Sequence, residues 1–333
     1  MIQDFCCPEY EHCCACPRNC GINRNAGERG FCGETAELRI AWAGLHFGEE
    51  PPITGSGGSG TIFITGCNLR CTFCQNFQIS QHGMGSAVTL EVFTSICLRL
   101  QAAGAENINI VTGSHVIPAL RIGLRTAKQQ GLTIPVVWNS SAYETVGELE
   151  SLAELVDGWL PDLKTLDSST AQRIFAAPSY PTQACAAIST MAELSPLHIT
   201  EPDDRYPLGK MLTGVIVRHL ALPGKMQDSK AVLQWFAQRL KNKALLSLMT
   251  QYTPVTANPQ KHKITAFENR LLNESEDLCL RTFLEDLNID DGFYQELVCD
   301  LDWLPDFNRI QTFSSALSKP LWHWKHGWIE TIL

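Results

Sequence analysis

The chain has 333 residues, of which 44% are hydrophobic and 18% charged, which is long enough for one large core with appendages or for two domains. Its net charge of -9 and the absence of a sustained run of Lys and Arg exclude a protein that binds nucleic acid along the phosphate backbone, because that binding needs clustered cations. The sequence contains no apolar run of membrane-spanning length and does not start with a secretory signal pattern. We therefore expect a cytoplasmic protein with neither nucleic acid nor membrane as a partner.

Cysteines are concentrated near the start of the chain, where ten of the fourteen lie within the first 74 residues. Without a secretory signal, this clustering is more typical of metal binding than of disulfides. One group has four thiols, enough for a closed zinc site or a complete iron–sulfur cluster: Cys13, Cys16, Cys20 and Cys32. Both metals remain open, and Cys14 could replace Cys13. The segment around them, CCACPRNCGINRNAGERGFCG, has little apolar content, so we expect bound metal to stabilise it. We expect residues 1–58 to form a cysteine-rich metal-binding segment.

Short β-rich runs then alternate with helical stretches. The expected strands are 61–66, 107–113, 133–139, 156–164, 214–222 and 244–249. The expected helices are 89–103, 116–130, 143–154, 168–176, 182–194 and 227–241. Apolar strands joined by helices indicate an α/β fold with a parallel sheet, either open and doubly wound or an incomplete barrel. We expect a partial (β/α)6 TIM-like barrel over 59–261, with its site at the carboxyl ends of the strands, and a helical C-terminal extension over 262–333.

A second cysteine motif, with the spacing C-x3-C-x2-C, follows the first expected strand and consists of Cys67, Cys71 and Cys74. A structural metal or a closed cluster takes four protein ligands, so three thiols indicate a metal position left open for chemistry. The alternative is zinc or a conventional cluster completed by a cysteine from elsewhere. With the aromatic Phe73 just before the last cysteine, and its place after the first strand of a βα series, the motif resembles that of the radical S-adenosylmethionine (SAM) superfamily.

The resemblance extends over roughly residues 55–255. The segments CNLRCTFCQNFQIS, NINIVTGSH, VVWNSSAYE, LPDLKTLD, VIVRHLALPG and LMTQYTP, in this order, are similar to the group related to pyruvate formate-lyase activating enzyme. The resemblance implies a 4Fe-4S cluster on the three cysteines, with SAM bound to the open iron. Reductive cleavage of SAM would give a 5′-deoxyadenosyl radical that abstracts a substrate hydrogen. It also implies a low-potential electron donor such as flavodoxin or ferredoxin.

The same resemblance implies contacts to SAM. Phe73 would lie near the adenine and Asn139 near the ribose, while Asp162 and Lys164 would hold the polar end with Arg218 nearby. Asn139, the Asp162–Lys164 element and Arg218 fall at expected strand termini, where a shared site would collect them.

One part of the sequence departs from the superfamily pattern. Many members have Gly-Gly-Glu after the second strand to receive the amino group of SAM, whereas this chain has Thr112-Gly113-Ser114-His115. We expect backbone carbonyls, Thr112 or Ser114 to take that role.

Three functional hypotheses follow. The first is an activase that places a glycyl radical on a partner enzyme, and the second is a radical SAM enzyme that modifies a peptide or a small molecule. The third is a non-enzymatic iron–sulfur electron carrier or a zinc-binding interaction module. Consumption of SAM by the reduced protein distinguishes the first two from the third.

Overall fold

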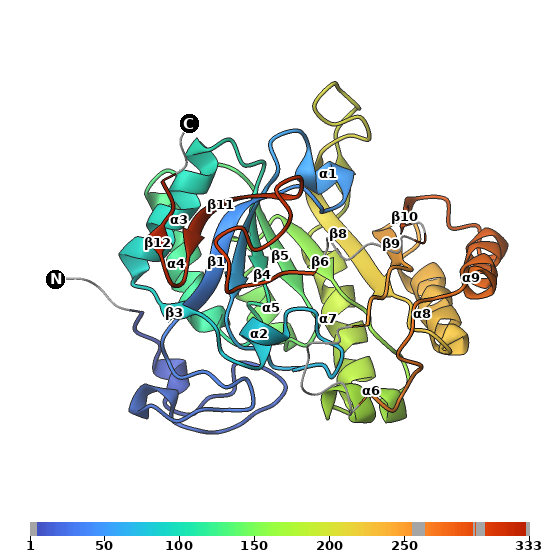
Figure 1. Cartoon of the computed structure of the whole chain (residues 1–333), viewed down its shortest axis with the longest axis horizontal. Helices are drawn as coiled ribbons and strands as arrows, with labels where there is room; N and C mark the ends of the chain where they lie inside the picture. The colour runs from blue at the N-terminus through green and yellow to red at the C-terminus, as the bar shows by residue number, and fades with distance from the viewer. Residues whose placement is uncertain (1–4, 255–263, 296, 298–303, 331–333) are drawn as a thin grey trace.

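A single mixed sheet forms the centre of the computed structural model, which describes residues 5–254, 264–295, 297 and 304–330. In the described residues the strand order is β10-β9-β8-β6-β5-β4-β2-β1-β11-β12. The path ends at β10 on one side and β12 on the other, so the sheet does not close on itself. The expected α/β fold with a partial, open barrel is therefore confirmed (Figure 1).

The six expected parallel strands all form, and they lie side by side in the middle of the sheet. They are β2 (Ser59–Ile64), β4 (Ile108–Val111), β5 (Val136–Ser140), β6 (Gly158–Pro161), β8 (Met211–Leu220) and β9 (Leu245–Met249). Their side chains are buried almost throughout, as is usual for parallel strands covered on both faces.

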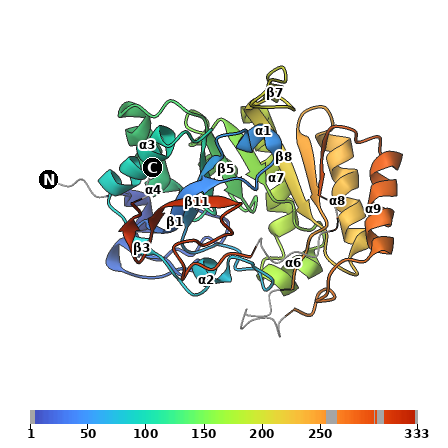
Figure 2. The same cartoon turned by 45° about the horizontal axis from the view of Figure 1, so that its top comes forward.

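The expected helices also form, and they cover the outer face of the sheet (Figures 1 and 2). They are α3 (Leu90–Ala102), α4 (Ile117–Gln129), α5 (Val146–Glu150), α6 (Ser168–Phe175), α7 (Tyr180–Leu194) and α8 (Met226–Arg239), with α5 shorter than predicted. Side chains cap several of their first turns: Thr89 accepts a hydrogen bond from the Val92 amide, and Asp167 accepts from two amides at the start of α6. Within the described ranges, no helix has the length and apolar character that a bilayer span requires.

The N-terminal segment differs from the expected irregular chain, because residues Arg39–His46 form strand β1. Seven of its eight residues are buried, and it pairs antiparallel with β2. Short elements surround it: the 3-10 helices η1 (Pro8–Tyr10) and η2 (Arg24–Ala26), and α1 (Pro51–Thr54), α2 (Phe77–Ser80) and β3 (Ser86–Ala87). A further short strand, β7 (His198–Ile199), pairs with β8.

The C-terminal extension is only partly helical, which corrects the expectation of a helical tail. It contains α9 (Glu274–Asp286) and three strands, β10 (Gly292–Gln295), β11 (Ser318–His323) and β12 (Gly327–Trp328). β10 adds a further parallel strand beside β9, whereas β11 pairs antiparallel with β1 at the other side of the sheet. The extension therefore contributes to both edges of the open barrel, whose unpaired backbone groups need partners.

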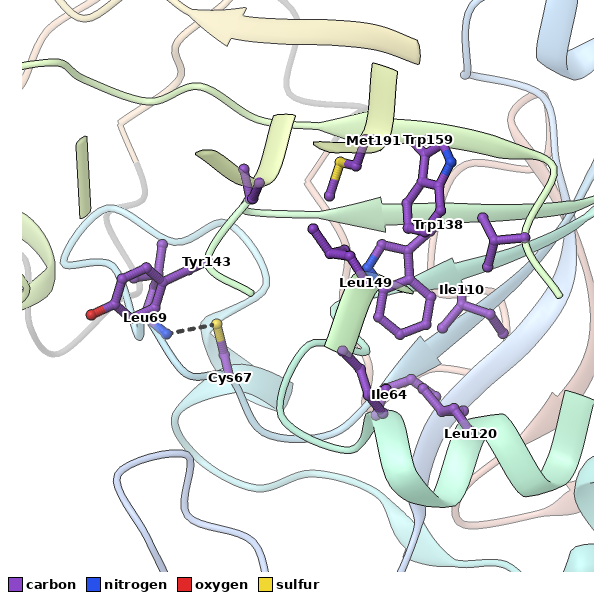
Figure 3. Close-up of a cluster of buried hydrophobic side chains, with 14 of the residues drawn as sticks. Ile64, Cys67, Leu69, Ile110, Leu120, Trp138, Tyr143, Leu149, Trp159 and Met191 are labelled. Carbon is purple, nitrogen blue, oxygen red and sulfur yellow. Dashed lines mark hydrogen bonds between the residues drawn. The ribbon is translucent and has the colours of Figure 1, made fainter. Parts of the chain in front are cut away.

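The core between the sheet and the helices extends to the start of the cysteine loop, as Figure 3 shows. Trp138 of β5 and Trp159 of β6 are fully buried there, next to aliphatic side chains from the helices. The same buried cluster includes Cys67 and Leu69 at the start of the loop. Close packing of this kind resists movement, so the start of the cysteine loop is held in place by the core.

Candidate active site

The loop that follows β2 carries Cys67, Cys71 and Cys74 at the carboxyl ends of the parallel strands. The Leu69 amide donates a hydrogen bond to Sγ of Cys67 at 3.3 Å (Figure 3). The Ser80 hydroxyl donates to Sγ of Cys74, also at 3.3 Å. Hydrogen bonds to sulfur stabilise the thiolate form, which is the form that binds metal.

Backbone conformation also shapes this loop. Arg70 has a positive φ of 51°, and Gly66 has a φ of 84°. A Cβ at Gly66 would lie 2.5 Å from Cγ of Glu34 and 2.8 Å from Nε2 of His115, so only glycine fits there. Residue 66 is thus the point where the N-terminal segment and the β4–α4 connection pack against the start of the loop.

Burial governs the thiol chemistry of the loop. It raises the pKa of Cys74 to about 11, with the Ser80 hydrogen bond acting in the opposite direction. It also raises the pKa of Cys71 well above its usual range, although the neighbouring Lys164 ammonium opposes this effect. Free thiols in this position therefore hold their protons at neutral pH. A metal cation that replaces the protons supplies the charge that buried thiolates need, so the donor set fits a metal cluster.

A cavity of about 650 Å³ opens beside the loop, which is a typical size for a small-molecule site. It is lined by the three loop cysteines and by six of the seven residues predicted to contact SAM: Phe73, Thr112, Asn139, Asp162, Lys164 and Arg218. These side chains come from the ends of β2, β4, β5, β6 and β8, and the parallel order of the strands brings them together.

Ser114 is the predicted contact that does not line this cavity. It is buried, and its hydroxyl donates a hydrogen bond to Oε1 of Glu144 at 2.5 Å. The indole of Trp138 donates to the same oxygen at 3.1 Å. Burial raises the pKa of Glu144, while these hydrogen bonds lower it. Ser114 thus solvates a buried carboxyl group, and of the two side chains proposed for the amino group of SAM only Thr112 faces the cavity.

Thr112 lies at the end of β4 with a φ of 64°, which is unusual for a β-branched residue. Its amide donates a hydrogen bond to the Asn139 carbonyl at 2.9 Å, so the strained residue is tied to the neighbouring strand. Backbone strain of this kind clusters at functional sites, where the surrounding structure holds it in place.

Asp162 and Lys164 form an ion pair inside the cavity, with Nζ of Lys164 2.6 Å from Oδ2 of Asp162. Burial lowers the pKa of Lys164, but Asp162 and Cys71 outweigh it, so the pKa is raised and the ammonium stays charged. Tyr180 fixes the backbone of the pair, since its hydroxyl donates to the Asp162 carbonyl at 2.7 Å and accepts from the Lys164 amide at 3.0 Å. Residues two apart on an extended segment share a face, which explains why both reach the cavity.

Arg218 faces the cavity as predicted, but two acidic residues that the sequence did not single out hold it. Nε of Arg218 donates to Oε1 of Glu50 at 2.9 Å, and Nη2 donates to both Glu49 and Glu50. Burial lowers the pKa of Arg218, but the two carboxylates outweigh it and raise it. Nothing local identifies Glu49 and Glu50 as site residues, because a Glu-Glu-Pro-Pro stretch is typical of a loop before a helix start.

The C-terminal extension supplies further lining residues that the sequence did not indicate. Phe293 and Gln295 of β10 line the cavity on one side, and Pro305 and Phe313 line it from the segment before β11. Tyr252, after β9, also lines it and contacts the ring of Phe73 at 6.2 Å. Aromatic residues near the end of a chain are ordinarily packing residues, so no sequence pattern identified these side chains as part of the site.

The N-terminal cysteines lie close to the loop. Cys13 is buried, Cys16 and Cys32 are half-buried, and Cys14 and Cys20 are exposed. Burial is the main cause that raises the pKa of Cys16 to about 12, and the nearby Cys32 and Cys13 contribute to this rise. Three of the four predicted ligands therefore influence one another, and Cys13 faces inward whereas Cys14 does not.

Arg18, within the N-terminal cysteine motif, joins this segment to the loop. Its guanidinium donates to the carbonyls of Asn68 at 2.7 Å and Phe175 at 2.7 Å, and to that of Ala176 at 2.6 Å. The guanidinium of Arg18 also stacks on the ring of Phe31, with Cζ 3.6 Å from the ring centroid. Arg18 was not predicted, although a cation inside a cysteine motif is a usable signal for a contact to backbone carbonyls.

In neither cysteine set do the described side chains surround a position for a single metal ion. Within the described ranges, no group of three or more His, Cys, Asp or Glu side chains is arranged to hold one metal ion. In a 4Fe-4S cluster each thiolate ligand binds a different iron. The three loop cysteines around one cavity fit such a cluster, whereas a metal at the N-terminal cysteines stays a prediction.

Comparison with known proteins agrees with this geometry. Residues 61–197 match the model of the radical SAM superfamily. An uncharacterized protein of Methanocaldococcus jannaschii is 29% identical over 252 residues, which cover 74% of this chain and 67% of that protein.

Structural comparison also matches the chain to solved structures, of which two follow. SuiB of Streptococcus suis bound to S-adenosylmethionine is 13% identical with a TM-score of 0.49, over 71% of this chain and 49% of that one, so this chain spans about half of SuiB. A domain of pyruvate-formate lyase-activating enzyme from Bacteroides vulgatus is 14% identical with a TM-score of 0.36, over 53% of this chain and 89% of that one. The family match contains the three-cysteine loop and the Asp162–Lys164 pair, so residues 61–197 are similar to the radical SAM superfamily domain where the candidate site lies.

Proposed function

We propose that this protein is a radical SAM enzyme that binds a 4Fe-4S cluster through Cys67, Cys71 and Cys74 and cleaves SAM reductively. The observation that carries the proposal is the meeting of these three thiols with the Asp162–Lys164 ion pair around one cavity. Bound there, the cluster and SAM would supply an electron and a 5′-deoxyadenosyl group that abstracts a substrate hydrogen.

The protein's own part is to bind and orient. The carboxylate of Asp162 and the ammonium of Lys164 together match the charges of a zwitterionic cofactor without adding net charge to the cavity. Phe73, in contact with the rings of Tyr252 and Phe267, offers an aromatic surface for the adenine. Asn139 is placed for the ribose, and a low-potential donor such as flavodoxin or ferredoxin would supply the electron.

We further propose that residues 1–58 form a cysteine-rich metal-binding segment, residues 59–261 the catalytic partial barrel and residues 262–333 an extension that sets specificity. Cys13, Cys16, Cys20 and Cys32 would hold zinc or a second cluster. Arg18, from this segment, contacts the backbone of the catalytic loop at Asn68, which supports a role in electron delivery for a metal bound there.

The hydrogen donor has two candidates. The sequence resemblance favours the glycine loop of a glycyl radical enzyme. Pro305 and Phe313 line the cavity from the C-terminal extension, which lies outside the segments that carry the resemblance, and this supports a different hydrogen donor. The second candidate is a small molecule or the end of a peptide.

Formation of 5′-deoxyadenosine tests the proposal. Anaerobically reconstituted and reduced protein should convert SAM to methionine and 5′-deoxyadenosine, and Cys71→Ala should not. Cys185→Ala is the matched control, since Cys185 lies on α7 away from the cavity. A Cys71→Ala protein that cleaves SAM normally refutes the proposal.

A further inference from the structure

The floor of the cavity is formed by a segment outside the family match. Glu49 and Glu50 directly precede α1, and Ile53 of α1 packs against Val137 and Leu160 inside the partial barrel. Helix α1 therefore blocks this end of the barrel interior. The side chains of Glu49 and Glu50 line the same cavity as the cysteine loop and the Asp162–Lys164 pair, but they come from the segment before α1.

The floor carries more negative than positive charge. Glu49 and Glu50 are each 8% exposed, and their permanently charged partner is Arg218, which is 11% exposed. Burial raises the pKa of Glu49, but Arg218 and His46 outweigh it and hold it at about 2, so the carboxylate is ionised. Nδ1 of His46 lies 3.4 Å from Oε1 of Glu49 and accepts from the Gly48 amide, also at 3.4 Å.

These side chains have two carboxylates for one permanently charged group, the Arg218 guanidinium. Glu49 and Glu50 share the Arg218 guanidinium, so a cation that enters the cavity at this floor is attracted by the negative charge that one guanidinium does not neutralise. The Asp162–Lys164 pair is neutral as a unit and does not supply this charge.

An aromatic surface stands beside the two carboxylates. The rings of His46 and Phe313 are 5.0 Å apart, and the rings of Phe313 and Phe63 are 5.4 Å apart. All three residues line the cavity. Ring faces attract cations, and an ammonium desolvated against them still retains favourable electrostatics.

Unpaired amide groups point to a polar ligand as well. Asn109 of β4 is fully buried, and neither its Oδ1 nor its Nδ2 has a hydrogen-bond partner in the described chain. It lies two residues before Val111, which lines the cavity, so its side chain is on the same, inner side of the strand. Gln251, which lines the cavity, likewise has a buried Oε1 without a partner among the described residues. Buried polar groups normally have partners, and an N–H donor from a ligand would provide one.

The walls limit the size of that ligand. The segment before β11 is held in place at Phe307, whose amide donates to Oε1 of Gln78 at 2.8 Å and whose carbonyl accepts from the Trp324 indole at 2.7 Å. Phe307 itself is fully buried. Pro305 and Phe313 from this anchored segment line the cavity, so its side wall is a packed part of the fold.

We propose that the Glu49–Glu50–Arg218 floor binds the ammonium group of a small aliphatic amine, which is the substrate of the site. The ammonium lies between the two carboxylates and the Phe313 ring, and the carbon chain extends toward the cysteine loop. The proposal rests on the proposed function for the reaction that follows, but the binding itself does not depend on it.

Binding of a matched pair of probes tests this inference. We would titrate reconstituted protein with 1,5-diaminopentane and with L-lysine by calorimetry, and compare 1,5-pentanediol and L-norleucine, which lack the terminal ammonium. The amines should bind at least about tenfold more tightly than their counterparts, because a hydrogen bond to a charged group exceeds that margin. Equal affinity for amine and alcohol, or no amine binding at millimolar concentration, overturns the proposal.

A variant locates the binding. Glu49→Gln keeps the size of the side chain and removes the excess charge, so amine affinity should fall at least about tenfold and by more than SAM affinity does. Glu9→Gln is the matched control, since Glu9 pairs with Arg121 on the surface at 2.5 Å. If Glu49→Gln weakens SAM and leaves the amine unaffected, the carboxylates serve the cofactor and the proposal is wrong.

Two further results keep the tests separate. A protein that binds amines but never cleaves SAM refutes the proposed function and leaves the amine site standing. If Glu49→Gln does not fold, as judged by circular dichroism, the comparison of amine with alcohol on the native protein still decides the matter.

Discussion

Replacing Lys164 with Met tests whether the Asp162–Lys164 pair positions the cofactor. The substitution keeps the length of the side chain but removes the ammonium that lies 2.6 Å from Asp162. A buried charge pair broken in this way costs about 3–5 kcal/mol, but Lys164 is 17% and Asp162 27% exposed, so we expect a loss of stability of about 1–3 kcal/mol.

The effect on the reaction should be larger than the effect on folding. A misplacement of the reacting group by about 1 Å costs on the order of a hundredfold in rate, which corresponds to about 2.7 kcal/mol in the barrier. We expect Lys164→Met to keep its full iron content and to form 5′-deoxyadenosine about a hundredfold more slowly, or to bind SAM correspondingly more weakly. Chromatography of the product and calorimetry of SAM binding measure the two effects.

A matched pair at the other end of the same strand provides the control. Lys128 lies 4.0 Å from Asp157, which directly precedes β6, whereas Asp162 directly follows it. Lys128→Met should leave SAM cleavage unchanged. The double variant Lys164→Met/Asp162→Asn removes the uncompensated carboxylate, so it should regain stability in urea without regaining activity. Native affinity and rate in Lys164→Met would refute the reasoning and reduce the pair to a polar strand end.

Three further predictions follow from particular contacts. Replacing both Cys16 and Cys20 with Ala should remove the metal of the N-terminal segment but leave the EPR spectrum of the loop cluster, and metal analysis that finds no loss would contradict the N-terminal site. Phe307→Ala should cost about 3–5 kcal/mol in urea unfolding, because a fully buried ring is deleted, and a loss below about 1 kcal/mol would contradict an anchored wall. His115 is buried and donates through Nε2 to the Thr65 carbonyl at 2.8 Å, and burial lowers its pKa to about 3, so the unfolded chain binds a proton that the folded chain does not. Stability should therefore fall as the pH drops from about 6.5 toward 3, and His115→Asn should flatten that part of the unfolding profile.

Much of the fold was predictable because its signals are local. Alternating apolar strands and helices indicate a parallel sheet, and the six strands and six helices appear within a few residues of the expected ranges. The same locality explains most of the site, since Asn139, Asp162 and Arg218 lie at or near the carboxyl ends of strands that the βα pattern predicts to be parallel.

The features that the sequence did not reveal depend on distant pairing. Trp322 in β11 pairs with Ala43 in β1, which is far away in the chain, and a stretch such as PLWHWKHGW has no local pattern that separates a paired edge strand from a helical tail. Glu49 and Glu50 belong to the site because they bind Arg218. Ser114 does not line the cavity, and its hydroxyl binds Glu144. Such choices of partner depend on three-dimensional proximity, which spacing along the chain does not encode.

The response of the reduced loop cluster to SAM tests the central claim most directly. Protein with iron restored only at Cys67, Cys71 and Cys74, through the Cys16→Ala/Cys20→Ala background, would be reduced and its EPR spectrum recorded with and without SAM. A cluster with three protein ligands leaves one iron open, so the spectrum should change on addition of SAM, and Cys71→Ala in the same background should abolish the signal. A spectrum that SAM leaves unchanged, in protein that binds its full complement of iron, would contradict the account.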